Sequence, residues 1–272
     1  MKRFMLAPLA ALGFSLGLAP AVSAQAEALT DVGEIIERAN LAAYYAGNDG
    51  RSEARMAIED AQGRTQLRQF TVLRRNRAAG GDQDFMVFFS RPSDVRGTVF
   101  LVAKKVEGDD DRWLYLPGLD LVRRISAGDK RTSFVGSNFF YEDVSGRNPA
   151  DDEHTLLETT AEHYVVESKP QDPGSVEFAR YVTRIDRTTF LPMRTDYHDA
   201  RDRVYRVMEV LGTEDIGGYP TVTRSKISDP VSGGSTLMEF RYTEYDVGLP
   251  ADIFSERYLR TPPLDWLRRS GE

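Results

Sequence analysis

The side chains best suited to catalysis or metal binding are few in this sequence and form no known motif. The three histidines, His154, His163 and His198, are not spaced as HExxH or as another close metal-ligand pattern. Ser137 and Ser235 each follow a glycine but lack the second glycine of the G-x-S-x-G nucleophile elbow. We therefore predict no metal site, no cofactor and no catalytic residues, and we expect that the protein is not an enzyme.

Acidic clusters offer a second kind of chemistry, but their positions favour turns and solvated loops. Residues 109–111 are three consecutive aspartates, which lack the ligand spacing of a calcium loop. A polar run between two apolar segments is typical of a hairpin turn. Glu142 and Asp143 could act as an acid and base pair, yet they lie in a predicted loop, where solvated carboxylates are usual.

The loop around those two carboxylates is unusually aromatic. Residues 131–147 read RTSFVGSNFFYEDVSGR, in which glycine and serine mark a loop that nevertheless carries Phe134, Phe139, Phe140 and Tyr141. Aromatic rings gain nothing from exposure to water. We therefore expect this loop to pack on the protein core, on a partner or on an apolar ligand.

One helix precedes this region and positions the rest of the chain. Asp31 can cap it, Glu34 follows three residues later, and apolar side chains recur at helical spacing at Val32, Ile35, Ile36, Ala39 and Ala43. Gly47 and the following Asn-Asp-Gly end the helix. The pattern predicts an amphipathic helix with one buried face.

From residue 52 onward the apolar pattern alternates with a period of two and is interrupted by a turn signal about every ten residues. Connections this short join antiparallel neighbours and cannot make parallel crossovers. The sequence predicts a short helix from Asp252 and strands over residues 52–61, 64–75, 83–90, 98–106, 112–124, 154–160, 163–168, 176–186, 191–199, 203–211, 221–228 and 235–247.

The predicted strands differ in how many of their faces are apolar. Residues 65–72 show one polar and one apolar face, as expected for the wall of a barrel or a curved sheet. Residues 85–89 and 98–103 are apolar on both faces, so something covers each side of these central strands. The N-terminal helix can cover one side, which leaves the other to line a core or a cavity.

The first 24 residues predict a cleavable secretory signal peptide. Lys2 and Arg3 precede an apolar run that ends near Leu18, and residues 22–24, Val-Ser-Ala, suit a cleavage site. We expect cleavage near Ala24 and export to the periplasm. Residues 25–272 contain no linker or composition shift, and we expect them to form one domain.

Composition excludes several classes of protein. The 272 residues include no cysteine, which rules out a cysteine-linked lipid anchor, a disulfide framework and a thiolate metal site. The formal net charge of −7 argues against nucleic acid or an anionic membrane surface as the main partner. No segment after the signal approaches the roughly 20 apolar residues of a transmembrane helix. We expect a soluble, acidic monomer.

Several segments in order resemble the outer membrane lipoprotein-sorting protein family. The resemblance covers most of the chain after the signal and rests on WLYLP at 113–117, VRRI at 122–125, KRTSFVGSNF at 130–139, YED at 141–143, YVVES at 164–168, ID at 185–186, LP at 191–192, YDVGLP at 245–250 and FSERYL at 254–259. The family's shared motif residues match Arg131, Phe134, Ser137, Phe139, Tyr141, Glu142 and Asp143.

The resemblance implies the fold of the periplasmic lipoprotein carriers LolA and LolB. That fold is mainly β: a strongly curved, incompletely closed antiparallel barrel, here of about 11 strands, with an N-terminal amphipathic helix and short helices covering its concave face. An apolar cavity lies between the sheet and the helices. The residues that we expect to line this cavity are Phe88, Phe100, Leu101, Trp113, Phe134, Phe139 and Tyr141.

Two interpretations of the loop motif stay open at the level of sequence. Arg131 and Asp143 either brace the loop as a structural ion pair or contact a ligand, and the brace is favoured. Phe134, Phe139 and Tyr141 either fill the core or line the cavity, because the same apolar chemistry serves both.

The resemblance implies a periplasmic carrier for a lipoprotein acyl chain or another lipid. Such a carrier needs no catalytic group. The alternative is an interaction module that docks on an RND-type inner-membrane exporter and has no ligand of its own. A hydrolase with an unfamiliar site is a third and weaker hypothesis.

Overall fold

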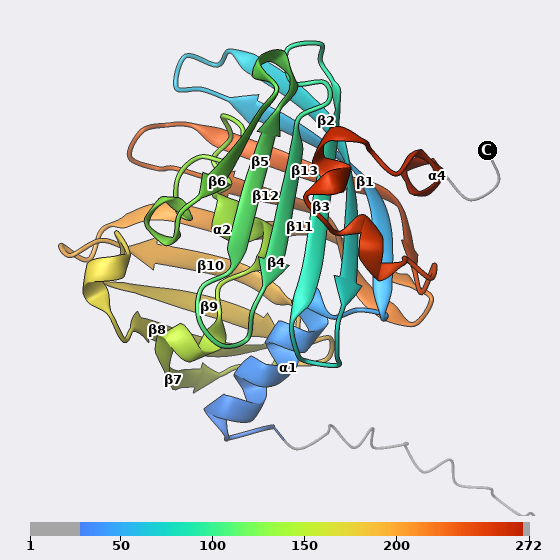
Figure 1. Cartoon of the computed structure of the whole chain (residues 1–272). Coiled ribbons are helices and arrows are strands. Elements are labelled where there is room, and N and C mark those ends of the chain that lie inside the picture. Colours follow the sequence, from blue (N-terminus) through green and yellow to red (C-terminus); the bar gives the residue numbers. More distant parts are fainter. Residues whose placement is uncertain (1–27, 269–272) are drawn as a thin grey trace, which may run out of the picture.

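A single antiparallel sheet of 13 strands wraps around the centre of the molecule without closing (Figure 1). The computed structural model describes residues 28–268, so the predicted signal peptide lies outside the described residues. The strands are β1 Asp49–Glu59, β2 Thr65–Asn76, β3 Gln83–Arg91, β4 Val99–Lys104, β5 Asp111–Leu116, β6 Leu121–Ile125, β7 Asp152–Thr159, β8 His163–Pro170, β9 Arg180–Asp186, β10 Pro192–His198, β11 Val204–Ile216, β12 Tyr219–Ser228 and β13 Ser235–Tyr245.

The sheet order is β6-β5-β4-β3-β2-β1-β13-β12-β11-β10-β9-β8-β7. Strands that are consecutive in sequence therefore pair with one another, except for β6 and β7, and β1 also pairs with β13, from Gly50 opposite Tyr245 to Glu59 opposite Ser235. Short turns make the pairings between consecutive strands local. The β1–β13 pairing joins the first half of the sheet, β1 to β6, to the second half, β7 to β13. Strands β6 and β7 are the two unpaired edges, which confirms the predicted open, mainly β architecture.

The N-terminal helix forms as its sequence predicts. Helix α1 spans Val32–Tyr44, and the Asp31 side chain caps it by accepting hydrogen bonds from the backbone N–H groups of Gly33 and Glu34. Its apolar residues Ile35 and Ala39 pack against Tyr164, Val166 and Ile185 of strands β8 and β9. The helix also contacts β7 and β12, so it crosses the concave side of the sheet.

The connection between β6 and β7 turns into the concave side instead of passing over the surface. It contains the short helix α2, Tyr141–Ser145, which lies inside the curve of the sheet in Figure 1. Phe134, Phe139 and Tyr141 of this segment join one core cluster with inward-facing residues of β1 to β6. The aromatic loop therefore packs on the protein's own core.

A second core cluster lies on the convex face of the same central strands. The C-terminal segment, with a 3-10 turn at Ala251–Ile253 and helices α3, Arg257–Arg260, and α4, Leu264–Leu267, covers it. Its members include Leu73, Met86, Phe88, Val99, Leu101, Leu249, Ile253 and Leu259. This arrangement explains why residues 85–89 and 98–103 are apolar on both faces.

Three expectations about elements need correction. The single strand predicted over residues 112–124 is two strands, β5 and β6, because Pro117 and Gly118 form a 3-10 turn between them. This split turns the twelve predicted strands into 13, whereas the family resemblance implied about 11. The C-terminal helices α3 and α4 lie on the convex face, whereas α1 and α2 lie on the concave face.

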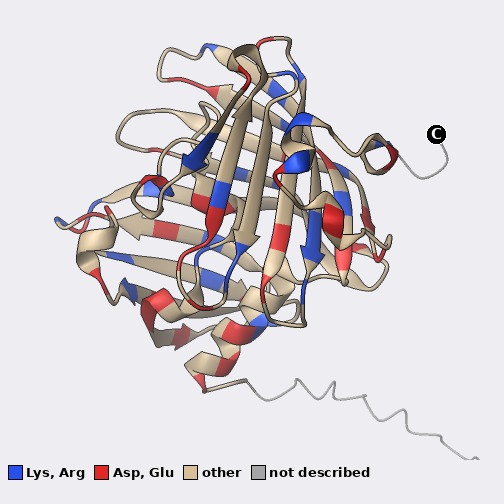
Figure 2. Ribbon diagram, in the orientation of Figure 1, with Lys and Arg blue, Asp and Glu red and all other residues tan. Residues whose placement is uncertain are grey.

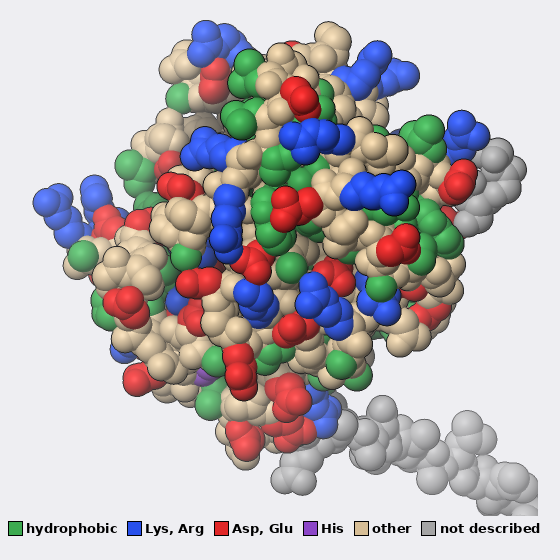
Figure 3. All heavy atoms as spheres, viewed as in Figure 1, with side chains coloured by type: hydrophobic (Ala, Val, Ile, Leu, Met, Phe, Trp, Pro, Cys, Tyr) green, Lys and Arg blue, Asp and Glu red, His purple; other side chains and the backbone are tan. Residues whose placement is uncertain are grey.

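Charged side chains of both signs are distributed along the strands and loops (Figure 2). On the face seen in Figure 3, positive and negative side chains alternate with small groups of apolar ones. Within residues 28–268, no helix combines the length and apolar character that a membrane span requires.

Candidate functional site

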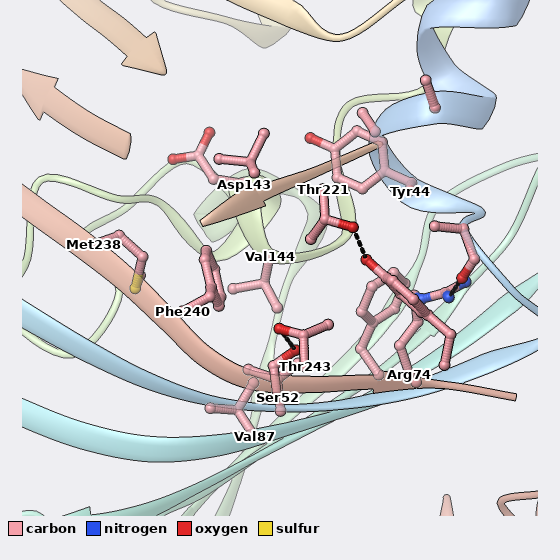
Figure 4. A pocket seen from close by; sticks show the side chains of 18 of the residues that line it. Tyr44, Ser52, Arg74, Val87, Asp143, Val144, Thr221, Met238, Phe240 and Thr243 are labelled. Carbon is pink, nitrogen blue, oxygen red and sulfur yellow. Dashed lines mark hydrogen bonds between the residues drawn. The ribbon is translucent and has the colours of Figure 1, made fainter. Parts of the chain in front are cut away.

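A pocket of about 250 Å³ remains on the concave side, between α1, the loop of residues 131–147 and strands β1, β2, β3, β12 and β13 (Figure 4). Its apolar wall comes from inward-facing strand residues, Phe70, Val72, Phe85, Val87, Met238 and Phe240. Phe134, Phe139 and Val144 from the inserted loop form another part of the lining. The concave side therefore keeps an apolar hollow beside the aromatic loop.

The polar groups of this pocket other than Asp143 gather mainly at one side. Ser52 Oγ donates to Thr243 Oγ1 at 2.9 Å, and Thr221 Oγ1 lies 2.9 Å from the Tyr245 hydroxyl. Arg74 and Tyr44 also line the pocket. Burial raises the pKa of Tyr44, so its hydroxyl stays protonated at neutral pH. The pocket thus has a long apolar wall and a smaller polar side, a composition typical of small-molecule sites.

Only part of the predicted cavity lining faces this pocket. Phe134 and Phe139 line it. Phe100 and Tyr141 lie on the same concave face, but they pack behind Phe134, with ring centroids 5.4 and 5.6 Å from its own. Whether any of these side chains contacts a ligand stays a prediction.

Phe88, Leu101 and Trp113 point the other way. They belong to the convex cluster beneath the C-terminal segment, so the expectation that they line the concave cavity is wrong. Successive side chains of a strand point to opposite faces, and both faces of β3 and β4 are apolar. The pattern within these strands therefore contained no signal for the inward face.

The sequence did contain an indirect signal for the lining residues that were missed. In the one-sided strand β2, Phe70 and Val72 mark the inner face. They pair with Phe89 and Val87 of β3, and paired residues share a face. Extending the pattern of β2 across this hairpin would have selected Phe85, Val87 and Phe89 over Phe88.

The aromatic loop is folded tightly around Phe134. The centroid of the Phe134 ring lies 5.7 Å from that of Phe89 and 5.6 Å from that of Tyr141. Ser137 stabilises the turn, because its Oγ donates to the Phe134 carbonyl at 2.7 Å and accepts from the backbone N–H of Phe139 at 3.1 Å. The motif residue Ser137 therefore shapes the loop.

Buried ion pairs hold the loop against the sheet. Arg131 donates to Glu142 and, at 2.7 Å, to Glu177, and its guanidinium lies 4.9 Å from the centre of the Phe178 ring. Burial would raise the pKa of Glu142, but the neighbouring cations Arg131, Lys130 and Arg147 outweigh it and hold this pKa below its usual value. Glu142 is therefore a buried, ionised carboxylate of helix α2, and the expectation of a solvated loop position is wrong for this residue.

Asp143 has a different partner from the one that we expected. It accepts from Arg206 of β11 and, at 2.6 Å, from the backbone N–H of Phe140. The Arg206 guanidinium also lies 4.3 Å from the centre of the Phe140 ring. Arg131 and Asp143 thus both act as braces, but in separate ion pairs, because Arg206 is 63 residues away in sequence and only the fold brings it close.

The open 13-stranded sheet, with a helix and an inserted loop on its concave face, defines a LolA-like fold. Three crystal structures are similar to it. A DUF1329 family protein from Desulfovibrio piger is 30% identical, with a TM-score of 0.75 over 84% of this chain and 95% of that chain. A domain from Vibrio parahaemolyticus, named for outer membrane lipoprotein sorting, is 24% identical, with a TM-score of 0.76 over 84% and 97%.

The third structure, a LolA superfamily protein from Nitrosomonas europaea, is 20% identical, with a TM-score of 0.64 over 85% of this chain and 100% of that chain. A family model described as "Uncharacterized protein" matches residues 81–261. No curated protein gave a significant match. The chain belongs to the DUF1329 family, and the resemblance to lipoprotein-sorting proteins is confirmed at the level of fold.

Proposed function

We propose that this protein is a periplasmic carrier that binds an acyl chain of a lipid or lipoprotein reversibly in the concave pocket. The observation that carries the proposal is an apolar hollow of about 250 Å³ left between α1, the aromatic loop and the sheet. The names of the similar structures from Vibrio parahaemolyticus and Nitrosomonas europaea, which refer to lipoprotein sorting and LolA, support a carrier role. Such a role needs no catalytic side chain.

The size of the pocket favours modest affinity. At about 250 Å³ the hollow lies just below the usual range of ligand pockets, about 300–1,000 Å³, so it has room for one chain at most. Burial of a sixteen-carbon chain gains about 12 kcal/mol at about 0.8 kcal/mol per methylene, and association costs about 4–15 kcal/mol. We expect a dissociation constant in the micromolar range, which lets a carrier release its cargo.

The alternative function, a docking module for an RND-type exporter without its own ligand, receives less support. A module of that kind needs no hollow, and its interior would be filled by side chains. Partner identity and monomeric state stay predictions. Extraction of the protein from its native envelope, followed by mass spectrometry of copurifying lipid, tests for a cargo directly.

Titration of delipidated protein with a fluorescent fatty-acyl probe tests the pocket. Ala42 lines the pocket from α1, and Ala42→Trp should fill the hollow and lower probe affinity at least tenfold. The neighbouring residue Leu41 is 37% exposed and outside the pocket lining, so Leu41→Trp is the matched control. Absence of saturable binding by the unmodified protein would contradict the carrier proposal.

The proposed location depends on the signal peptide, which lies outside the described residues. Export with cleavage near Ala24 gives a chain that begins at Gln25 and carries no cysteine for lipid attachment. N-terminal sequencing of protein from the periplasmic fraction checks this. A chain that keeps Met1 and fractionates with the inner membrane would refute it.

A further inference from the structure

Arg74 brings a positive charge into the wall of the pocket without an ion-pair partner. The residue is 9% exposed and lines the hollow from strand β2. Its guanidinium donates through Nη1 to Asn76 Oδ1 at 2.7 Å and through Nη2 to the Ala46 carbonyl oxygen. Both acceptors are uncharged, so the guanidinium charge is not neutralised by contact.

The other buried arginines of the described chain all have carboxylate partners. Arg51 pairs with Glu53, Arg68 with Asp94, Arg112 with Asp110 and Arg206 with Asp143, at N–O distances up to 3.7 Å. Among residues 28–268, Arg74 is the buried arginine for which no such pair is formed. A buried charge is costly unless it is paired, which marks this position as exceptional.

The acidic groups that face Arg74 act only from a distance. Asp49 accepts hydrogen bonds from the backbone N–H groups of Val247, Gly248 and Leu249. Asp246 accepts from Asn48 and from the Tyr219 hydroxyl. These carboxylates are held by their own donors and do not contact the guanidinium.

Tyr245 and Tyr45 also face Arg74. Burial lowers the pKa of Arg74, and the attraction of Tyr245, Asp49 and Asp246 opposes this shift. Arginine nevertheless stays protonated in proteins. A positive charge therefore persists at the polar side of the pocket.

Resting on the carrier function proposed above, we propose that the cargo is an amphiphile with an apolar chain and an anionic head, either a carboxylate or a phosphate. Arg74 holds the head, and Phe70, Val87 and Phe240 hold the chain. Arginine's planar set of N–H donors matches both kinds of oxyanion. The ligand would supply the negative charge that the protein itself does not place in contact with Arg74.

The position of Asp143 fixes the orientation of this ligand. Asp143 also lines the pocket, and Figure 4 shows it away from Arg74, which lies with Tyr44 and Thr221 on the other side of the view. Its carboxylate is occupied by Arg206 and the Phe140 N–H. The Asp143 carboxylate offers an anionic head no hydrogen-bond donor, whereas Arg74 attracts it, so the apolar chain points along the wall toward Met238 and Phe240.

Three ligands with the same twelve-carbon chain distinguish the contribution of the head group to affinity from that of the chain. They are laurate, dodecyl phosphate and uncharged dodecanol. Their affinities for the delipidated protein are measured by displacement of the fluorescent acyl probe, below the critical micelle concentrations. We expect at least one anion to bind at least tenfold more tightly than dodecanol, because hydrogen bonds to charged groups are the stronger ones. The tighter of the two anions identifies the head group.

Variants of Arg74 test the assigned residue. Arg74→Gln should remove the tenfold preference and leave dodecanol affinity within about twofold, whereas Arg74→Lys should keep a preference for anions. Arg68→Gln is the matched control, since Arg68 is buried on the same strand but outside the pocket lining. It should leave the preference unchanged.

The possible outcomes separate the two proposals. Equal affinity for all three ligands would overturn the anionic-head inference and leave the carrier function standing. No binding of any ligand or of the probe would overturn the carrier function itself. If Arg74→Gln fails to fold, the ligand preference of the unmodified protein and of Arg74→Lys still decides the inference.

Discussion

The guanidinium of Arg131 donates a hydrogen bond to the carboxylate of Glu142, and both side chains are buried on the concave side of the sheet. Arg131 precedes the aromatic turn and Glu142 lies in the first turn of helix α2, which follows it, so this ion pair closes the loop at its base. Arg131 also reaches Glu177, in the connection before β9, at 2.7 Å. The same pair therefore fastens the inserted loop to the second half of the sheet.

Breaking this pair should destabilise the protein strongly. Arg131→Met leaves Glu142 buried with only the more distant cations Lys130 and Arg147, at 3.4 and 3.5 Å. We expect the free energy of unfolding to fall by about 3 kcal/mol, measured by urea denaturation. Arg38→Met, which removes an exposed pair with Glu34, is the control and should cost less than about 0.5 kcal/mol. Equal effects of the two variants would refute a bracing role for Arg131.

Acid should weaken the same contact. Because the folded-state pKa of Glu142 is held below its usual value, its ionised form stabilises the folded protein above the unfolded pKa of about 4.3. This contribution is lost as the pH falls below about 4.3 and through the folded-state pKa. Urea denaturation at pH 7 and pH 3 should show a smaller loss of stability in Glu142→Gln than in the unmodified protein. An equal loss in both proteins would exclude Glu142 as a source of acid sensitivity.

Phe139 and Phe88 provide a test of the two faces. Each ring is buried, Phe139 beside the concave pocket and Phe88 beneath the C-terminal segment. Truncation of either to alanine should lower stability by about 3–5 kcal/mol. Only Phe139→Ala should also change affinity for the acyl probe, measured by fluorescence titration at a temperature where both variants are folded. Unchanged stability and binding in Phe139→Ala would contradict its packed position.

Lys104 should make stability rise with pH in the alkaline range. Its ammonium donates to the Ser145 carbonyl at 2.6 Å, and burial lowers the pKa of Lys104 to about 8 against the opposing attraction of Asp110. Between pH 8 and the unfolded value of about 10.4, the unfolded chain binds more protons at this position, so rising pH favours the folded state.

The comparison with Lys104→Met isolates this effect, because both proteins share all tyrosines. The free energy of unfolding of the unmodified protein, relative to that of Lys104→Met, should increase between pH 7.5 and pH 10, as measured by urea denaturation. A difference that is constant with pH would mean that Lys104 keeps its ordinary pKa.

Much of the fold could be predicted because its signals are local. The cap at Asp31, the helical spacing of Ile35 and Ala39, and the regular turns set one helix and an antiparallel meander, as observed. The resemblance carried by motifs such as residues 130–139 also predicted the open, curved form of the sheet. Most strands that are neighbours in sequence are also neighbours in this sheet, which is why periodicity and turn spacing predicted most of the pairings; the exceptions are the pairing of β1 with β13 and the lack of pairing between β6 and β7.

The tertiary structure alone decided which face of each central strand points inward. Phe88 and Leu101 alternate with Val87 and Phe100, and an apolar pattern on both faces is symmetric under exchange of inside and outside. The symmetry is broken only when the distant C-terminal segment covers one face and residues 131–147 cover the other.

The sequence by itself thus determined most of the elements, their antiparallel character and the family resemblance, since each depends on side chains close together in the chain. The pairing of β1 with β13 joins distant residues and was decided by the tertiary structure. Tertiary structure decided the partners of the charged groups, such as Asp143 with Arg206, and left Arg74 with hydrogen-bond partners but no carboxylate in contact within residues 28–268. Ion pairs act over a few ångströms, and residues far apart in sequence reach that distance only after the sheet has curved and the loop has folded into it.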